Sequence, residues 1–417
     1  MPGEIRRSPV KSVGAARNPA TAAGQAKGPQ HQGQSFSKRV KKKFRIFSVR
    51  SGLDMPFLFL ILVLLVIGLV MLFSSSYAYA YYNYGNSYYF IMRQAVFAVM
   101  GVTGMLLISY FDYHHLHKFA IPLLLISYFF LVVVLFLPAQ KGVHRWIDLG
   151  PFGFQPSEIA KLAMTLCFAH LISINFKRMD TARYGVLPYV ILLGITVFLL
   201  IREPHVSAAV IIIAMAGMMM FIGGVPLRWF AMAFGVVAAA LLYLVLFTSE
   251  FGYANDRIVA WLDPFTTNKE LLADTWQTRQ SLYAIGSGGL LGLGLGQSRQ
   301  KYLYLPEPQN DFIFAIVCEE LGFIGALIIV ILFALLVWRG VTISLKAKDK
   351  FGMLLGIGLT LQVGLQVVLN IAVITNTIPN TGISLPFFSY GGTSLVILLA
   401  QMGVVLSISR TSAIEKT

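Results

Sequence analysis

The sequence predicts an all-α protein that crosses a membrane about ten times and carries one large extracytoplasmic loop. Of its 417 residues, 57% are hydrophobic and 12% are charged, whereas a soluble domain carries about 25% charged residues. The mean hydropathy is +0.72. The apolar residues also form long runs such as Met55–Ser74, which contains no charged residue. About 20 mostly apolar residues are enough for a helix to cross the bilayer, so each such run predicts a span.

The segment before the first run, residues 1–54, is predicted to be a basic cytoplasmic tail. Residues 1–35 are rich in Ala, Gly, Pro, Ser and Gln, and we expect them to be disordered because they have little apolar surface to bury. The run Lys38–Arg45 is strongly basic and lies just before the first span, a pattern typical of topology signals that contact anionic lipid. The net charge of +15 is therefore interpreted as favouring a membrane surface and not nucleic acid.

The apolar runs predict a transmembrane domain over residues 55–408, followed by a short cytoplasmic tail at 409–417. Pro204 separates the fifth and sixth runs, which are either two spans or one broken, re-entrant element. Short loops on one side carry most of the Lys and Arg, which predicts an even number of spans with both termini in the cytoplasm. The predicted spans are residues 55–75, 90–111, 119–137, 156–175, 186–202, 205–224, 227–248, 312–338, 352–376 and 384–408.

The loop at residues 249–311 is long and polar, and it is predicted to lie outside the membrane. Loops of this length in compact proteins are usually functional or disordered. This loop contains Trp261, Trp276 and several tyrosines, which favours an ordered structure.

Asp311 ends this loop beside a strongly apolar run, and it is the first candidate for chemistry. Partial desolvation there would raise the pKa of its carboxyl and make it a better general base. The alternative is that Asp311 caps the following helix, and the two roles are compatible. Glu319 and Glu320 lie deeper in the same run, and we interpret them as partners of basic residues or backbone inside the bundle.

A second polar region comprises Arg145–Gly150 and Gln155–Lys161. Glu158 and Lys161 are three residues apart on a predicted helix, so they share a face and can form an ion pair. Such a pair is either structural or part of the wall of a polar cavity. His205 interrupts apolar sequence just downstream, and it is either a structural residue or a proton relay.

Two further segments have unusual composition. Gly286–Gly296 is dense in glycine, and its backbone N–H groups could cradle a phosphate, with Arg257, Arg279, Arg299 and Lys301 as candidate partners of the same anion. Pro379–Ser394 combines Pro, Gly and hydroxyl residues at the entry to the last span. That combination predicts a broken helix end that lines a cavity. The chain has only Cys167 and Cys318, which offer neither a disulfide framework nor a metal cluster.

Taken together, these segments resemble the SEDS family, which includes FtsW, RodA and SpoVE. The order of the motifs along residues 55–408 makes the resemblance specific, and it is closer to FtsW and SpoVE than to RodA. The motifs are Arg145-Trp146-Ile147-Asp148, Gln155-Pro156-Ser157-Glu158 with Lys161, Gln277 with Gln280-Ser281, Gly294-Leu295-Gly296, Gln300-Lys301, Tyr304-Leu305-Pro306-Glu307, Asp311-Phe312-Ile313-Phe314-Ala315, Glu319-Glu320-Leu321-Gly322 and Ser389-Tyr390-Gly391-Gly392.

The resemblance implies an inverting peptidoglycan glycosyltransferase that polymerises lipid II and releases undecaprenyl pyrophosphate, at the division septum of a bacterial inner membrane. The implied partners are a class B penicillin-binding protein and other membrane proteins of the divisome, with no nucleic acid. The family's essential aspartate corresponds to Asp311, which we expect to be the general base. The residues expected to bind the substrate are Arg257, Lys301, Glu307, Gln277, Gln280, Ser281, Arg145, Trp146, Ser389 and Gly391. No cofactor is expected with certainty; a divalent cation, Mg or Mn, is the open alternative, and the sequence shows no dedicated ligand cage.

The chain departs from the family pattern at three places near these motifs. Gln309-Asn310 stands where the family commonly has His-Thr before the aspartate. His205 stands where an acid is often found, and Thr381 stands where many relatives have a lysine before the last span. Two other functions stay open at this point. A lipid II flippase would carry its key charges near the middle of the membrane, and a non-catalytic division scaffold would not need Asp311.

Overall fold

The computed structural model describes residues 52–138, 144–148, 153–235, 261–266 and 272–411. Nearly all of the predicted tail, much of the run at 227–248, the first part of the long loop with Arg257, and residues 412–417 lie outside the described residues. Within the described part the chain is almost entirely helical. The helices are α1 Met55–Tyr84, α2 Tyr89–Tyr110, α3 Leu116–Leu135, α4 Pro156–Asn175, α5 Leu187–Arg202, α6 Val206–Ile222, α9 Leu272–Gly288, α10 Ile313–Leu345, α11 Lys350–Ile374 and α12 Gly392–Thr411.

The fold is that of a polytopic membrane protein, as the sequence predicts. Eight helices of the described part are long and apolar enough to cross a membrane, and α6 is a shorter apolar helix. Short 3-10 helices at Tyr113–His115 and Phe176–Arg178 and a π-helix at Ala182–Val186 connect several of the long ones. The strands β1 Ile147–Asp148 and β2 Gly153–Phe154 form an antiparallel hairpin, in which Ile147 pairs with Phe154.

Local signals set where α1 begins and ends. Asp54 precedes the helix, and its carboxylate accepts a hydrogen bond from the backbone N–H of Phe57 at 3.0 Å, which satisfies an otherwise unpaired donor of the first turn. Gly85 ends the helix with φ 67° and donates to the carbonyl of Tyr81 at 2.9 Å, the usual left-handed cap. The helix therefore runs well beyond the predicted limit at residue 75.

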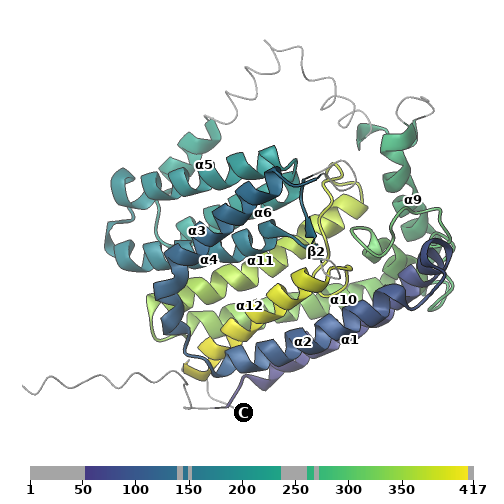
Figure 1. Cartoon of the computed structure of the whole chain (residues 1–417), viewed down its shortest axis with the longest axis horizontal. Coiled ribbons are helices and arrows are strands. Elements are labelled where there is room, and N and C mark those ends of the chain that lie inside the picture. The colour runs from purple at the N-terminus through teal and green to yellow at the C-terminus, as the bar shows by residue number, and fades with distance from the viewer. Residues whose placement is uncertain (1–51, 139–143, 149–152, 236–260, 267–271, 412–417) are drawn as a thin grey trace, which may run out of the picture. The chain divides into compact units, whose positions relative to one another are not determined.

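The helices that surround the site pack through small residues. α2 and α12 lie side by side along their length (Figure 1), and Gly101 of α2 leaves room for Leu399 of α12, which would lie 2.5 Å from an added Cβ. In the same way, Gly68 of α1 allows close approach of the backbone carbonyl of Phe387. In a membrane, small residues at these contacts let backbones approach and gain van der Waals packing.

The last helix begins at Gly392, later than the predicted limit at 384. Residues 378–391 form an irregular segment before it, because Pro386 cannot donate a backbone hydrogen bond and interrupts helix formation. This segment lines a cavity, so the predicted broken helix end is confirmed. The described part of the long loop is also ordered: it contains α9, which packs against α10 and α11.

Candidate active site

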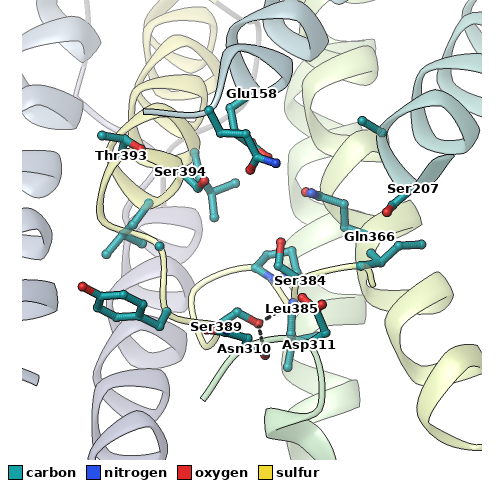
Figure 2. A pocket seen from close by; sticks show the side chains of 18 of the residues that line it. Glu158, Ser207, Asn310, Asp311, Gln366, Ser384, Leu385, Ser389, Thr393 and Ser394 are labelled. Carbon is teal, nitrogen blue, oxygen red and sulfur yellow. Dashed lines mark hydrogen bonds between the residues drawn. The ribbon is translucent and has the colours of Figure 1, made fainter. Parts of the chain in front are cut away.

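A cavity of about 490 Å³ lies where the loop before α10 meets the irregular segment before α12 (Figure 2). Its walls also come from α2, the β1–β2 hairpin, the first turns of α4 and α6, and α11. Six of the predicted site residues line it, together with the predicted ion pair: Arg145, Trp146, Glu307, Asp311, Ser389, Gly391, and the pair Glu158 and Lys161.

Asp311 is partly buried in the wall of this cavity. Burial raises the pKa of its carboxyl to about 6; the neighbouring Glu307 carboxylate raises it further, and the Arg145 guanidinium opposes the shift. A carboxylate with a pKa near neutrality can accept a proton and release it again at physiological pH. The alternative role of helix cap is wrong, because α10 is capped at Phe312, without a side-chain cap.

The backbone around Asp311 is held by the irregular segment. The hydroxyl of Ser389 donates to the carbonyl of Asn310 at 2.8 Å and accepts from the backbone N–H of Leu385 at 2.7 Å (Figure 2). The backbone N–H of Tyr390 also donates to the carbonyl of Gln309 at 2.8 Å. These bonds join the two loops into one unit, so Ser389 acts here on the loop that presents Asp311.

Asn370 of α11 makes a second connection between the same two loops. Its side-chain amide donates to the carbonyl of Asp311 at 2.7 Å and to that of Ile383 at 2.6 Å, and the side chain is fully buried. Gln94 of α2, also fully buried, accepts a hydrogen bond from the backbone N–H of Gly391 at 3.2 Å. Neither residue is among those predicted from the sequence, although a polar amide inside an apolar span is a recognisable signal of a functional or structural contact.

The opposite wall carries charge. Glu158 and Lys161 form the predicted ion pair, with Glu158 Oε1 and Lys161 Nζ 2.7 Å apart and both side chains largely buried. Arg145 lies two residues before the hairpin and donates to the backbone carbonyl of Pro204. Trp146 packs over Gly153 of the facing strand, so the hairpin holds both side chains at the cavity.

His205 also lines the cavity, and its Nδ1 is buried without a hydrogen-bond partner. Burial, with the nearby charges of Arg145 and Lys161, lowers the pKa of His205 to about 3, so this histidine is neutral at physiological pH. Glu203 beside it is fully buried, and burial raises its pKa to about 8. A neutral imidazole with so low a pKa is a poor proton relay, which favours the structural interpretation.

Three predicted substrate-binding residues lie on α9, outside the residues that line the cavity. Gln277 accepts a hydrogen bond from the side chain of Asn380 at 3.1 Å, and the hydroxyl of Ser281 donates to the carbonyl of Ile374 at 2.9 Å. Gln280 is 6% exposed. These residues hold α9 against the segment that leads to the cavity, and their role in binding substrate stays a prediction, as does that of Arg257.

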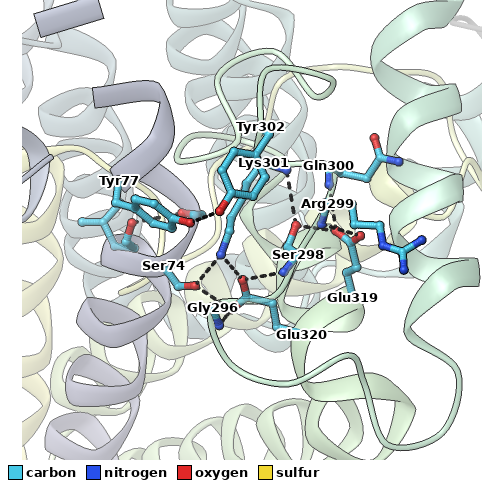
Figure 3. A network of polar contacts seen from close by, with 12 residues as sticks. Ser74, Tyr77, Gly296, Ser298, Arg299, Gln300, Lys301, Tyr302, Glu319 and Glu320 are labelled. Carbon is cyan, nitrogen blue, oxygen red and sulfur yellow. Dashed lines mark hydrogen bonds and ion pairs between the residues drawn. The ribbon is translucent and has the colours of Figure 1, made fainter. Parts of the chain in front are cut away.

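Lys301 is the clearest departure from the predicted site. Its side chain is fully buried and forms an ion pair with Glu320, with Nζ 2.7 Å from Oε1 (Figure 3). It also lies over the ring of Tyr77, 4.8 Å from the ring centroid. In this position Lys301 does not reach the cavity, so a direct contact with substrate does not fit the structure.

The glycine-rich loop explains why Lys301 is held there. The backbone N–H groups of Gly296 and Ser298 donate to the carboxylate of Glu320 at 3.0 and 3.2 Å. Those of Arg299 and Gln300 donate to the carboxylate of Glu319 at 2.9 and 3.3 Å (Figure 3). Of these four donors only Gly296 belongs to the predicted segment Gly286–Gly296, and the anions held here are the protein's own two carboxylates and not a phosphate. We call this arrangement the carboxylate nest. The structural interpretation of Glu319 and Glu320 is thereby confirmed.

No group of three or more His, Cys, Asp or Glu side chains that could hold a metal ion is found among the residues with described positions. The expectation of a divalent cation stays untested by this geometry. Glu307 and Asp311 are two carboxylates in one wall, but Glu307 Oε2 already accepts a hydrogen bond from the side chain of Asn310 at 2.8 Å.

Comparison with known proteins agrees with the motifs and the fold. The family model of FtsW, RodA and SpoVE, described as "Cell cycle protein", matches residues 55–414. The chain is 39% identical over 335 residues to "Stage V sporulation protein E" of Bacillus subtilis, covering 79% of this chain and 90% of that protein. It is 38% identical over 328 residues to "Probable peptidoglycan glycosyltransferase FtsW" of Geobacter sp. strain M18, covering 78% and 88% respectively.

Solved structures show the same similarity in three dimensions. One chain, from the study "Structural coordination of polymerization and crosslinking by a peptidoglycan synthase complex", matches with a TM-score of 0.70 at 26% identity. The match covers 86% of this chain and 98% of that one. The rod shape determining protein RodA of Thermus thermophilus matches with a TM-score of 0.64 at 27% identity, covering 87% and 99%.

Proposed function

The chain belongs to the family of FtsW, RodA and SpoVE cell cycle proteins, and from this membership and the cavity we infer that it is a peptidoglycan glycosyltransferase. We propose that it polymerises lipid II into glycan strands during septal synthesis of the cell wall. The observation that carries the mechanism is Asp311, a carboxyl with a raised pKa in the wall of a polar cavity. A relative and a structural neighbour that are named for peptidoglycan synthesis support the substrate class.

In the proposed reaction, Asp311 accepts the proton of the 4-hydroxyl of GlcNAc on one lipid II molecule. The oxygen of that hydroxyl attacks the anomeric carbon of the lipid-linked sugar of the donor. The new C–O bond forms as the bond to the pyrophosphate breaks, so the configuration inverts and undecaprenyl pyrophosphate leaves. General base assistance is typically worth about 10²–10⁴-fold in rate.

Arg145 is positioned to stabilise the negative charge that develops on the leaving pyrophosphate. Arg145 lines the cavity and is close enough to Asp311 to lower the pKa of its carboxyl. Fixed cations stabilise negative charge strongly in sites that exclude water. Arg257, which the sequence offers as a candidate partner of an anion, lies outside the described residues, so its part in the reaction stays a prediction. The burial of Lys301 removes it from consideration for the same role.

The partner proposed for this enzyme is a class B penicillin-binding protein that crosslinks the product. The support is a structural neighbour that comes from a complex coordinating polymerisation and crosslinking. We further propose that both termini are cytoplasmic and that the cavity opens toward the outer face of the inner membrane, where the lipid-linked substrate is displayed. Other divisome proteins and a divalent cation remain part of the proposal.

The test is glycan polymerisation from labelled lipid II by the purified full-length protein, with and without its cognate class B synthase. We expect polymer from the wild type and none from Asp311→Asn, whereas Asp263→Asn, in an exposed aspartate outside the cavity lining, should keep activity. Polymer from Asp311→Asn at the wild-type rate would refute the base assignment. Lipid II flipping in vesicles without polymer under any partner condition would instead support the transporter.

A further inference from the structure

A series of stacked side chains runs from the cavity to the last residue of α1, Tyr84, by way of the first turns of α2. Tyr390 lines the cavity, and its hydroxyl interacts with the guanidinium of Arg93, which also lines it. Arg93 lies over the ring of Tyr89, 4.3 Å from the centroid. Tyr89 in turn stacks on Tyr84, with centroids 4.0 Å apart and an angle of 6° between the planes.

These four side chains form an ordered stack. Two groups cannot share one face of a ring at about 4 Å, so Arg93 and Tyr84 lie on opposite faces of Tyr89. Phe90 packs against three of these rings, with centroid distances of 5.2 Å to Tyr89, 4.8 Å to Tyr390 and 5.7 Å to Tyr84, each edge to face. Edge-to-face and offset stacking are the favoured geometries of aromatic pairs, so the rings are fixed in place, and Tyr84 ends the series 51% exposed.

The length of α1 places this end above the hydrocarbon of the membrane. The helix has 30 residues, which corresponds to about 45 Å, whereas the hydrocarbon core is about 30 Å thick. Its opposite end carries the ion pair between Asp54 and Arg339, with Oδ2 and Nη2 2.8 Å apart, and because charges are costly inside hydrocarbon we infer that this end lies at the membrane boundary. Even a tilt of about 40° leaves the last turn outside the hydrocarbon. Tyr84 therefore lies at the level where the sugars of a lipid-linked substrate are displayed.

We propose that the series Tyr390, Arg93, Tyr89 and Tyr84 is a saccharide-binding track that holds the growing glycan strand as it leaves the cavity. The inference rests on the proposed function, because a polymerase must keep hold of sugar units that have already been joined. Arg93 and Tyr84 cover the two faces of the Tyr89 ring, so the contact with sugar rings falls mainly to the half-exposed Tyr84. A tyrosine suits this purpose, because its electron-rich ring attracts the C–H groups of a sugar and its hydroxyl can hydrogen-bond. Arg93 adds a cation that attracts the carboxylates of the peptide stems.

An ordinary belt of interfacial tyrosines is the alternative, because tyrosine is enriched at membrane surfaces. Such a belt accounts for exposed tyrosines on any side of the end of α1. It does not explain a continuous stack that starts at a cavity-lining residue. Tyr82 provides the comparison: it lies on the same last turns of α1, is 75% exposed, and is not part of the stack described above.

The experiment measures glycan length by gel electrophoresis at early times, with purified full-length protein, its cognate synthase and labelled lipid II. Tyr84→Ala should shorten the strands about fivefold, because losing one aromatic contact speeds release of the strand by about that factor. The initial rate of lipid II consumption should stay within about twofold, since Tyr84 is not among the residues that line the cavity. Tyr84→Phe, which keeps the ring, and Tyr82→Ala should give strands of wild-type length.

Strands of unchanged length from Tyr84→Ala would overturn the track, as would equal shortening by Tyr82→Ala. Both results require polymer from the wild type, so they leave the proposed function standing. A wild type that makes no polymer would overturn the proposed function itself, and the track with it. Because Tyr84 is half-exposed at the end of a helix, the alanine variant is expected to fold; its thermal unfolding temperature, compared with that of Tyr84→Phe, checks this.

Discussion

Replacing Lys301 by alanine is expected to destabilise the fold and not to remove a contact with substrate. Lys301 Nζ lies 2.7 Å from Glu320 Oε1, and both side chains are fully buried. Removing one partner of a buried ion pair typically costs about 3–5 kcal/mol, because the other charge is left without compensation. We expect the free energy of unfolding to fall by an amount in that range.

Removing Lys301 and removing Glu320 should cost different amounts of stability, because the partner that remains keeps different contacts in the two cases. Without Lys301, Glu320 still accepts from the hydroxyl of Ser74 at 2.6 Å and from the backbone N–H groups of Gly296 and Ser298. Without Glu320, Lys301 Nζ keeps one neutral partner, the Ser74 hydroxyl at 3.4 Å, and the rings of Tyr77 and Tyr302, and it has no anionic partner among the residues whose contacts are given above. Lys301→Ala should therefore cost about 3 kcal/mol and Glu320→Ala about 5 kcal/mol.

The assay is reversible unfolding of the purified protein in mixed detergent and SDS micelles, followed by polymerisation of labelled lipid II under folding conditions. Lys348→Ala, which removes an exposed lysine, is the control and should change the free energy of unfolding by less than about 0.5 kcal/mol. A Lys301→Ala protein of wild-type stability that no longer polymerises lipid II would refute the reasoning. That result would support the prediction from the sequence that Lys301 contacts the substrate.

Three further predictions follow from the site. The pKa of Asp311, raised to about 6 by burial and then by Glu307, predicts that activity falls about tenfold for each pH unit below that value, because the base is protonated. Glu307→Gln should move this acid limb to lower pH in a pH–rate profile, and an unmoved limb would contradict the assignment. Asn370→Ala removes two buried hydrogen bonds that hold the loops, so kcat should fall about 10–100-fold with little change in KM; a change confined to KM would argue against positioning. Gly292→Ala would place a Cβ 2.2 Å from the carbonyl oxygen of Glu320 at φ +79°, which should cost about 2–5 kcal/mol in SDS unfolding, and wild-type stability would show that the loop can move aside.

The sequence predicts the spans well because each apolar run must satisfy its own backbone inside the membrane. It predicts the cavity in part, since Glu158 and Lys161 are close along one helix and Pro379–Ser394 cannot form a regular helix. Asp311 is identified by its place at the membrane boundary and by the family resemblance. Each of these signals comes from residues that are close along the chain, so a single sequence is enough to recognise them.

The contacts that the sequence analysis missed or misplaced are between distant segments. Lys301 and Glu320 are 19 residues apart, and no helical spacing predicts that the glycine-rich loop folds back over α10. Asn370 reaches the carbonyl of Asp311 across 59 residues. A loop lysine and a buried amide each have many candidate partners in a sequence, and only the packing of the helices selects among them.

The pairing of α2 with α12 sets a condition on how the protein is made. Gln94 and Gly391 share a hydrogen bond although they are 297 residues apart, so α2 must wait in the bilayer until nearly the whole chain has left the ribosome. During that interval the side-chain oxygen of Gln94 lacks the hydrogen bond that it later accepts from the backbone N–H of Gly391. An unsatisfied polar group in lipid is costly. The cavity can therefore be completed only after the start of the last span has been made, and a chain truncated before α12 keeps this polar group unsatisfied, a feature that membrane quality control could recognise.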